Sequence, residues 1–174
     1  REYQATSATE AEVTAFRNVL LLVEASGQIS DRYDKHVLLP FAEYLPGEAS
    51  VSALRDLVPF AGRMTSGEGP KLLTVDGGTV APLICYEGVL SDVVRGAFQP
   101  VAPDVLINAT NDVWFSGQGP HLHRMIVLWR AVETRRPLIR VTSTGLSAVA
   151  FPDGTLHGEI GLGREETTRV DLPL

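Results

Sequence analysis

The chain has one cysteine among 174 residues, and several other features are scarce. A single cysteine cannot form an internal disulfide, so the redox compartment cannot be read from it. No apolar run is long enough to span a bilayer. The formal net charge of -6 argues against nucleic-acid binding, which needs a basic stripe on the surface. No signal peptide is visible and Arg1 is not a natural start, so we expect a processed chain or an excerpt.

The composition is that of an ordinary soluble globular protein. Hydrophobic residues make up 44% of the chain and charged residues 21%, which at this length is enough for one domain with a real core. We find neither an internal repeat nor a low-complexity tract. The region 1–174 is therefore predicted to form a single domain.

Strand patterns alternate with helix patterns, and the first four strands are paired by turn signals into two hairpins. The loop at 31–46 mixes aromatic and charged residues and contains two prolines, which argue against a helix there. Together these patterns predict an α/β domain with a mixed sheet. The expected strands lie at 16–24, from 29 onward, and at 71–75, 79–84, 104–108, 138–142, 146–151 and 167–172. The expected helices lie at 49–60, 89–98 and 120–135.

Cys85 follows directly on an apolar run, 80–84, and precedes a turn-prone Gly88 and the helical pattern at 89–98. The pattern predicts a strand, a sharp turn and a helix, with Cys85 at the end of the strand. Such a turn presents the side chain at an open end and directs backbone N–H groups toward whatever it attacks. On this stretch alone, a small buried apolar role for the cysteine is the competing interpretation.

Three stretches, taken in order, resemble one family. The first is 33–36 with 40–46, the second is 84–87, and the third is Asn108 to Phe115 with a following helix that ends in Arg136-Pro137. The first two resemble the lysine and nucleophile segments of the carbon–nitrogen hydrolases, also called the nitrilase superfamily. The third resembles its apolipoprotein N-acyltransferase branch. The matches span residues 16 to about 172.

The resemblance implies a four-layer α-β-β-α sandwich with mixed sheets and a Glu-Lys-Cys triad. Cys85 matches the nucleophile and Lys35 matches the lysine, whose positive charge favours the attacking thiolate. Glu43 matches a second glutamate that positions the lysine and the substrate, while Tyr86 and Glu87 match residues that support the nucleophile. The ammonium and the N–H after Cys85 would hold the oxyanion of the tetrahedral intermediate.

Three more residues are predicted by the resemblance to support the site or position the substrate: Asn111, Trp114 and His123. His121 and His123 do not form a metal pair, because residues two apart on a helix point in different directions and no further ligand has the spacing for zinc. We therefore expect no metal, and nothing in the chain indicates a cofactor.

The general-base glutamate of the family has no counterpart by motif. The family places it well upstream of the lysine, and Glu10, Glu12 and Glu24 lie in no matching context. The first strand and helix of the fold are not represented either, so the sandwich is expected to be incomplete at the N-terminus. We expect this partial domain to fold marginally, with an exposed edge near 16–24, and to be inactive in full turnover.

The resemblance implies an N-acyltransferase that moves a fatty acyl chain from a phospholipid, through a cysteine thioester, to the N-terminal amine of a diacylglyceryl-cysteine apolipoprotein. The implied location is the periplasmic side of the bacterial inner membrane, with membrane surface as a partner and no nucleic acid. Two alternatives remain open at this stage. One is a soluble amidase or nitrilase, in which water replaces the amine, and the other is a non-catalytic remnant of the fold.

The region at 49–64, with the 41–44 segment, is rich in apolar side chains and poor in charges. We expect it to form an apolar wall over the site that faces lipid, because large exposed apolar patches usually indicate contact with a membrane or partner. An ordinary helix docked on the sheet is the alternative. The side chains in question are Val51, Leu54, Leu57, Val58, Phe60 and Met64.

Overall fold

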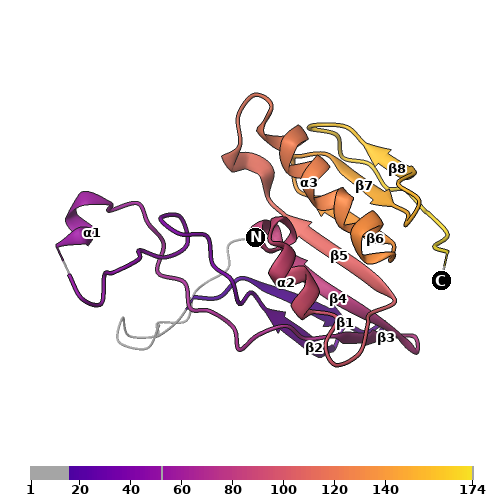
Figure 1. The fold of residues 1–174 in the computed structure, drawn as a ribbon, viewed down its shortest axis with the longest axis horizontal. Helices are drawn as coiled ribbons and strands as arrows, with labels where there is room; N and C mark the ends of the chain where they lie inside the picture. Colours follow the sequence, from indigo (N-terminus) through magenta and orange to yellow (C-terminus); the bar gives the residue numbers. More distant parts are fainter. Residues whose placement is uncertain (1–15, 52, 174) are drawn as a thin grey trace.

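A computed structural model describes residues 16–51 and 53–173, which form a two-stranded hairpin and a six-stranded mixed sheet with helices (Figure 1). The hairpin pairs β1 (Val19–Val23) with β2 (Ile29–Asp34). The sheet order is β3-β4-β5-β6-β7-β8. Its strands are β3 (Leu73–Val75), β4 (Gly78–Ile84), β5 (Val105–Thr110), β6 (Leu138–Thr142), β7 (Ser147–Ala150) and β8 (Leu156–Ile160).

The three central strands β4, β5 and β6 are parallel, and the outer strands join them as antiparallel hairpins. Each parallel step needs a crossover, and each crossover contains a short 3₁₀ turn followed by a helix. The first contains η1 (Cys85–Val89) and α2 (Ser91–Gly96), and the second contains η2 (Asp112–Trp114) and α3 (Gly119–Thr134). The carboxyl ends of the central strands therefore lie at one edge, which is where open α/β sheets commonly bind ligands.

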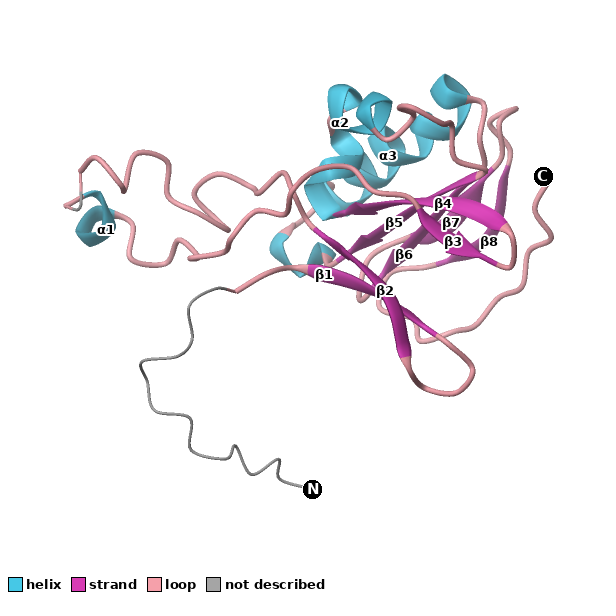
Figure 2. Cartoon of the chain, turned by 90° about the horizontal axis from the view of Figure 1, so that it is seen from below, coloured by secondary structure: helices cyan, strands magenta, loops and turns pink. Residues whose placement is uncertain are grey.

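Helices α2 and α3 both cover one face of the six-stranded sheet, with the β1–β2 hairpin on the other side (Figure 2). The buried core lies between the helices and the sheet, because alternate side chains of each strand point toward the helices. Its members are Ala81, Leu83, Val94, Ala97, Leu106, Val127, Leu128, Ala131, Leu138, Ala148 and Ala150.

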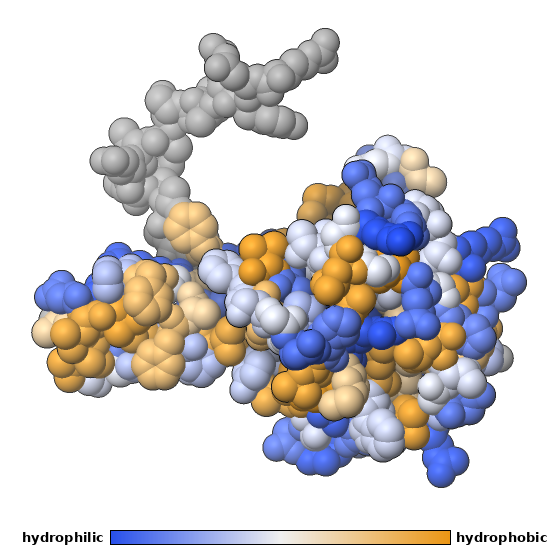
Figure 3. Space-filling view, turned by 90° about the horizontal axis from the view of Figure 1, so that it is seen from above, coloured by the Kyte–Doolittle hydropathy of each residue, from blue (hydrophilic) through white to orange (hydrophobic). Residues whose placement is uncertain are grey.

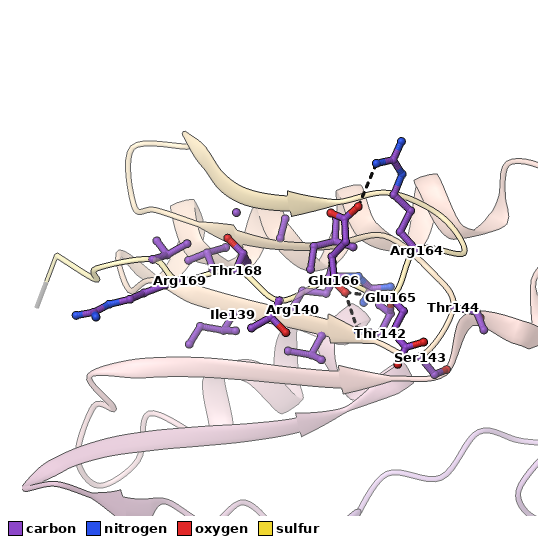
Figure 4. Close-up of a pocket in the computed structure, with 18 of the residues that line it drawn as sticks. Ile139, Arg140, Thr142, Ser143, Thr144, Arg164, Glu165, Glu166, Thr168 and Arg169 are labelled. Carbon is purple, nitrogen blue, oxygen red and sulfur yellow. Dashed lines mark hydrogen bonds and ion pairs between the residues drawn. The ribbon is translucent and has the colours of Figure 1, made fainter.

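The opposite face of the sheet is only partly covered. A cavity of about 950 Å³ lies there, between β6, β7, β8 and the segment that follows β8 (Figure 4). The β1 strand is also uncovered, since Val19, Leu21 and Val23 are 42%, 43% and 53% exposed. These apolar residues alternate along the strand, a pattern that is typical of a strand with one face packed against another part of a protein.

An arm, defined as residues 41–51 and 53–64, projects from the sheet between β2 and β3 (Figure 1). Its base is closed by backbone hydrogen bonds from Gly62 to Ala42 (2.7 Å) and from Met64 to Glu43 (2.9 Å). The predicted 49–60 helix is reduced to α1 (Leu54–Leu57). None of the residues of α1 is buried, so a longer helix here would lack the packing that stabilises short helices.

The hairpins at both expected positions are confirmed, and α3 begins at the proline-containing turn that the sequence predicts. The expected strand at 167–172 is wrong, because that segment has no sheet partner, and the last strand is β8 instead. Within residues 16–51 and 53–173, no helix combines the length and the apolar character needed to cross a bilayer.

Candidate active site

Cys85 lies where β4 ends and η1 begins, and its backbone has φ 52°, in the left-handed region. A non-glycine residue held there costs about 1–3 kcal/mol, and such strain persists only where the surrounding structure enforces it. The cysteine is partly buried and is not in a disulfide. The strand, turn and helix predicted from the sequence are thus present, with the thiol at the turn.

Lys35 follows directly on β2, and its side chain is fully buried. Its Nζ lies 2.6 Å from Oε2 of Glu43, at the base of the arm. The same oxygen of Glu43 accepts a hydrogen bond from the Leu39 backbone N–H (2.7 Å), and the other oxygen accepts one from the Asn18 side chain. A buried ammonium needs such a partner, because an unpaired charge away from water is costly.

Glu87, two residues after the nucleophile turn begins, is completely buried. Its Oε1 accepts hydrogen bonds from the Tyr33 hydroxyl (2.9 Å) and from the backbone N–H groups of His36 (2.9 Å) and Val37 (3.0 Å). Its Oε2 accepts one from the backbone N–H of Ile84 (2.8 Å). One carboxylate therefore ties the segment after Lys35 to the turn that carries Cys85.

The environment of Glu87 also affects Tyr33. Burial raises the pKa of the Tyr33 hydroxyl above its ordinary value, and the nearby negative charge of Glu87 raises it further. The hydroxyl therefore stays protonated and acts as a donor to Glu87. His36 Nδ1 lies 2.7 Å from the same hydroxyl and 3.0 Å from Glu87 Oε1, so three side chains share this contact.

A second buried network lies on the helix side of the sheet. Asn108, at the core of β5, donates through Nδ2 to the carbonyl oxygens of Leu83 (3.3 Å) and Cys85 (3.2 Å). Arg140, on β6, donates to Asn108 Oδ1 (2.6 Å) and to Asp112 Oδ2 (2.7 Å). This network thus connects β4, β5, β6 and η2 beneath the nucleophile turn.

His123, on α3, completes that network. Its Nδ1 lies 2.9 Å from Asp112 Oδ1, and the ring is 5% exposed. Burial lowers the pKa of His123 below its ordinary value, while Asp112 opposes that shift. His123 therefore lies close beneath the site, held by a carboxylate.

The remaining predicted residues, Tyr86, Asn111 and Trp114, are exposed or only partly buried. Tyr86 is partly buried within η1. Asn111 accepts hydrogen bonds from the Val113 backbone N–H (3.1 Å) and the Ser143 hydroxyl (2.8 Å), so it holds η2 to the β6–β7 turn. Trp114 is 84% exposed, so any substrate contact it makes would be at the surface of the site.

The candidates for a general base remain unsupported. Glu10 and Glu12 lie outside the described residues. Glu24 is exposed in the turn between β1 and β2, at the opposite end of that hairpin from Lys35. No group of three or more His, Cys, Asp or Glu side chains within the described ranges could hold a metal ion.

Sequence reasoning did not assign roles to Tyr33, His36, Asn108, Asp112 or Arg140. Arg140 does carry a sequence signal, since it is a charge in the middle of an otherwise strand-like segment, 138–142. A charge in such a place is buried only when it is paired, so a partner could have been sought. Which partner it pairs with follows only from the strand order.

The family model for carbon–nitrogen hydrolases matches residues 5–174. Among curated proteins, the chain is 39% identical over 153 residues to an apolipoprotein N-acyltransferase of Bdellovibrio bacteriovorus, covering 84% of this chain and 28% of that protein. It is 35% identical over 165 residues to one of Sinorhizobium fredii, covering 91% and 30%. The chain therefore spans about a third or less of the length of these relatives.

Solved structures with a similar fold include an amidase from Nesterenkonia sp., with a TM-score of 0.60 and 23% sequence identity. The similarity covers 83% of this chain and 51% of that one. The likeness extends to the arrangement of the strands and helices and so concerns the fold.

Proposed function

The chain belongs to the carbon–nitrogen hydrolase family, and we propose that it carries the nucleophile and lysine of an apolipoprotein N-acyltransferase. The observation that supports this most is the Glu87 carboxylate, which binds the backbone on both sides of the site and so joins the strained Cys85 turn to the buried Lys35–Glu43 pair. The names of the curated relatives support the acyl transfer. The proposed site residues are Cys85 and Lys35, with Glu43, Tyr86, Glu87, Asn111, Trp114 and His123 in support.

In the proposed first step, the Cys85 thiolate attacks the ester carbonyl of a phospholipid. The C–S bond forms, the ester C–O bond breaks, and the leaving lysophospholipid oxygen takes up the proton that the Cys85 thiol released on forming the thiolate. The Lys35 ammonium and the N–H that follows Cys85 stabilise the oxyanion that develops on the carbonyl oxygen.

In the second step, the α-amine of a diacylglyceryl-cysteine apolipoprotein attacks the thioester. The C–N bond forms, the C–S bond breaks, and the proton lost by the amine is transferred to the departing Cys85 sulfur, so the thiol is restored. The proposal places this chemistry at the surface of the bacterial inner membrane, on its periplasmic side. We propose one domain for the chain, because hairpin, arm and sheet all contribute to the same site.

The test is intact mass spectrometry after incubation with phosphatidylethanolamine vesicles. We expect a mass increase of one acyl chain that hydroxylamine removes, as it does thioesters, and no increase in Cys85→Ala. Release of ammonia from simple amides without any acyl adduct would instead identify an amidase. If the folded protein shows neither reaction, the chain is a non-catalytic remnant.

The arm supports a lipid-facing role for this end of the molecule. Figure 3 shows apolar side chains gathered on the projecting arm, where Leu57 and Phe60 are 78% and 79% exposed and Phe41 and Val51 are more than half exposed. Exposed apolar side chains in such number are uncommon unless they meet lipid or a partner. The base of the same arm is where Glu43 meets Lys35.

Replacing Leu57 and Phe60 together by serine should weaken binding to phospholipid vesicles by at least about tenfold. Each large apolar side chain contributes about 1.5–3 kcal/mol when fully buried, and a membrane-inserted tip buries part of that surface. Vesicle co-sedimentation measures the change. The matched control is Leu122→Ser with Trp129→Ser, two side chains that are also exposed (55% and 64%) but lie on α3. Equal losses in both pairs would contradict a specific role for the arm.

A further inference from the structure

Arg140 is a charged residue inside a sheet, only 1% exposed. It lies directly opposite Asn108 in the parallel register of β5 and β6, and Asn108 lies opposite Leu83 in the register of β4 and β5. The three positions form a row across the central strands that ends beside the Cys85 turn. Arg140 is paired by hydrogen bonds to Asn108 and Asp112, and its guanidinium also lies 3.2 Å from His123 Nδ1, so the charge is buried with partners.

Arg140 determines which way the Asn108 amide faces. A guanidinium only donates hydrogen bonds, so the atom 2.6 Å from it must be the amide oxygen of Asn108. With the oxygen held by Arg140, the amide NH₂ is directed at the carbonyl oxygens of Leu83 and Cys85. Without the arginine, the amide could rotate, and nothing else among these contacts fixes the NH₂ on the Cys85 carbonyl.

The Cys85 carbonyl in turn sets the direction of the next N–H. The peptide between Cys85 and Tyr86 is planar and trans, so its C=O and N–H point in opposite directions. Because Asn108 holds the C=O on the buried side of the turn, the Tyr86 N–H is directed to the other side. This N–H is the backbone group that follows the proposed nucleophile.

We propose that Arg140 is a positioning residue that, through Asn108, directs the Tyr86 N–H at the carbonyl oxygen of the ester that Cys85 attacks. The inference rests on the proposed role of Cys85 as nucleophile. It concerns the oxyanion of the tetrahedral intermediate and leaves the thiol itself unaffected.

Two reactions of the same thiol separate these roles. Alkylation by iodoacetamide needs the thiolate but forms no oxyanion, whereas acylation by p-nitrophenyl butyrate passes through a tetrahedral oxyanion. Cys85 is the only cysteine in the chain, so both reactions report on it alone. In Arg140→Met, acylation should slow by about 10- to 100-fold, since loss of a full oxyanion donor costs about 10²–10³. The rate of alkylation should change by less than about threefold, which allows for small indirect effects of the substitution.

Variants of the pair test whether Arg140 acts through Asn108. Asn108→Ala should show the same selective loss, and the double variant should be no slower than the slower single variant. Arg140→Lys, which keeps a donor for the Asn108 oxygen, should recover most of the acylation rate. Arg136→Met is the control, because Arg136 also donates to a backbone carbonyl, that of Pro103 (2.7 Å), at the other end of the sheet. It should change neither reaction.

The inference is overturned if acylation and alkylation fall together in all variants, which is the result of a merely structural role. It is equally overturned if the losses multiply in the double variant. If Arg140→Met does not fold, Asn108→Ala and Arg140→Lys decide the question alone. If p-nitrophenyl butyrate does not acylate the wild-type protein, both the inference and the assignment of Cys85 as nucleophile are wrong. Acylation by this ester but not by phospholipid removes only the proposed function.

Discussion

Replacing Lys35 by methionine is expected to slow the acylation of Cys85 by an ester by about 10²–10³. Methionine has nearly the same length and no charge, so it fills the buried space of Lys35 but removes the ammonium. The two residues are joined through Glu87, which binds the amides just after Lys35 and the amide just before Cys85. A fully buried ammonium in that position is not hydrated and acts on the nearby reaction at low effective dielectric.

Two further variants serve as controls for this prediction. Lys35→Met leaves Glu43 as a half-paired carboxylate, so the combination with Glu43→Gln separates the loss of the cation from the penalty of the unpaired acid. Lys35→Arg keeps the charge but not the shape. Rates are measured with a p-nitrophenyl ester and by intact mass on phospholipid. If the methionine variants acylate as fast as the wild type at equal folded concentration, Lys35 has no part in the reaction.

Glu87→Gln is expected to lower the free energy of unfolding by about 2–5 kcal/mol. The Glu87 carboxylate accepts hydrogen bonds from the Tyr33 hydroxyl and from the backbone N–H groups of His36, Val37 and Ile84. A glutamine offers one oxygen and one NH₂, so either Ile84 or the other three donors would face a donor and stay unsatisfied. The loss of the charge removes the stronger, charge-assisted form of the remaining bonds as well.

Urea unfolding, followed by tryptophan fluorescence, measures this change. The matched control is Glu159→Gln, at a side chain that is 55% exposed and pairs with Arg124 on α3, and its unfolding midpoint should stay near that of the wild type. A wild-type midpoint for Glu87→Gln would mean that the carboxylate does not hold the two segments together. Selective loss of acylation, with stability unchanged, would place Glu87 in the chemistry itself.

The sequence correctly predicts those turns and helix ends whose conformation depends on neighbouring residues in the chain. The hairpin turn at Asp76-Gly77 has both residues at positive φ, as a two-residue hairpin turn requires, and its sequence shows this directly. Pro120 lies in the first turn of α3, and Arg135 ends the helix in the left-handed conformation. These features need no knowledge of distant residues.

The incorrect secondary-structure predictions concern segments whose structure depends on contacts with distant parts of the chain. The segment 167–172 has β-branched residues but no strand to pair with, whereas β8 contains a histidine, a glycine and a glutamate and is a strand because β7 lies beside it. Propensity in strands is mostly a measure of packing against neighbours, so it fails at such an edge. The segment 49–60, likewise, has a helical pattern, but only α1 forms there and none of its residues is buried.

The site divides in the same way. Cys85, Lys35, Glu43 and Glu87 could be proposed because the segments that contain them, taken together and in order, resemble the motifs of one family. The buried row of Leu83, Asn108 and Arg140 could not, because their proximity depends on the order and register of three parallel strands. No periodicity in the sequence records which strand lies next to which.

The hydrogen bonds of Glu87 also bear on how the protein folds during its synthesis. They close loops of 50 and 51 residues, from the nucleophile turn back to the segment after Lys35, and the link from Arg140 to Asn108 spans a further 32. Contacts of such sequence separation form late in folding, because loop closure must precede them. A chain in which β6 has not yet been made therefore lacks the link from Arg140 to Asn108. If the proposed role of Arg140 holds, the Cys85 of such an unfinished chain is expected to react with acyl esters more slowly than the Cys85 of the finished domain.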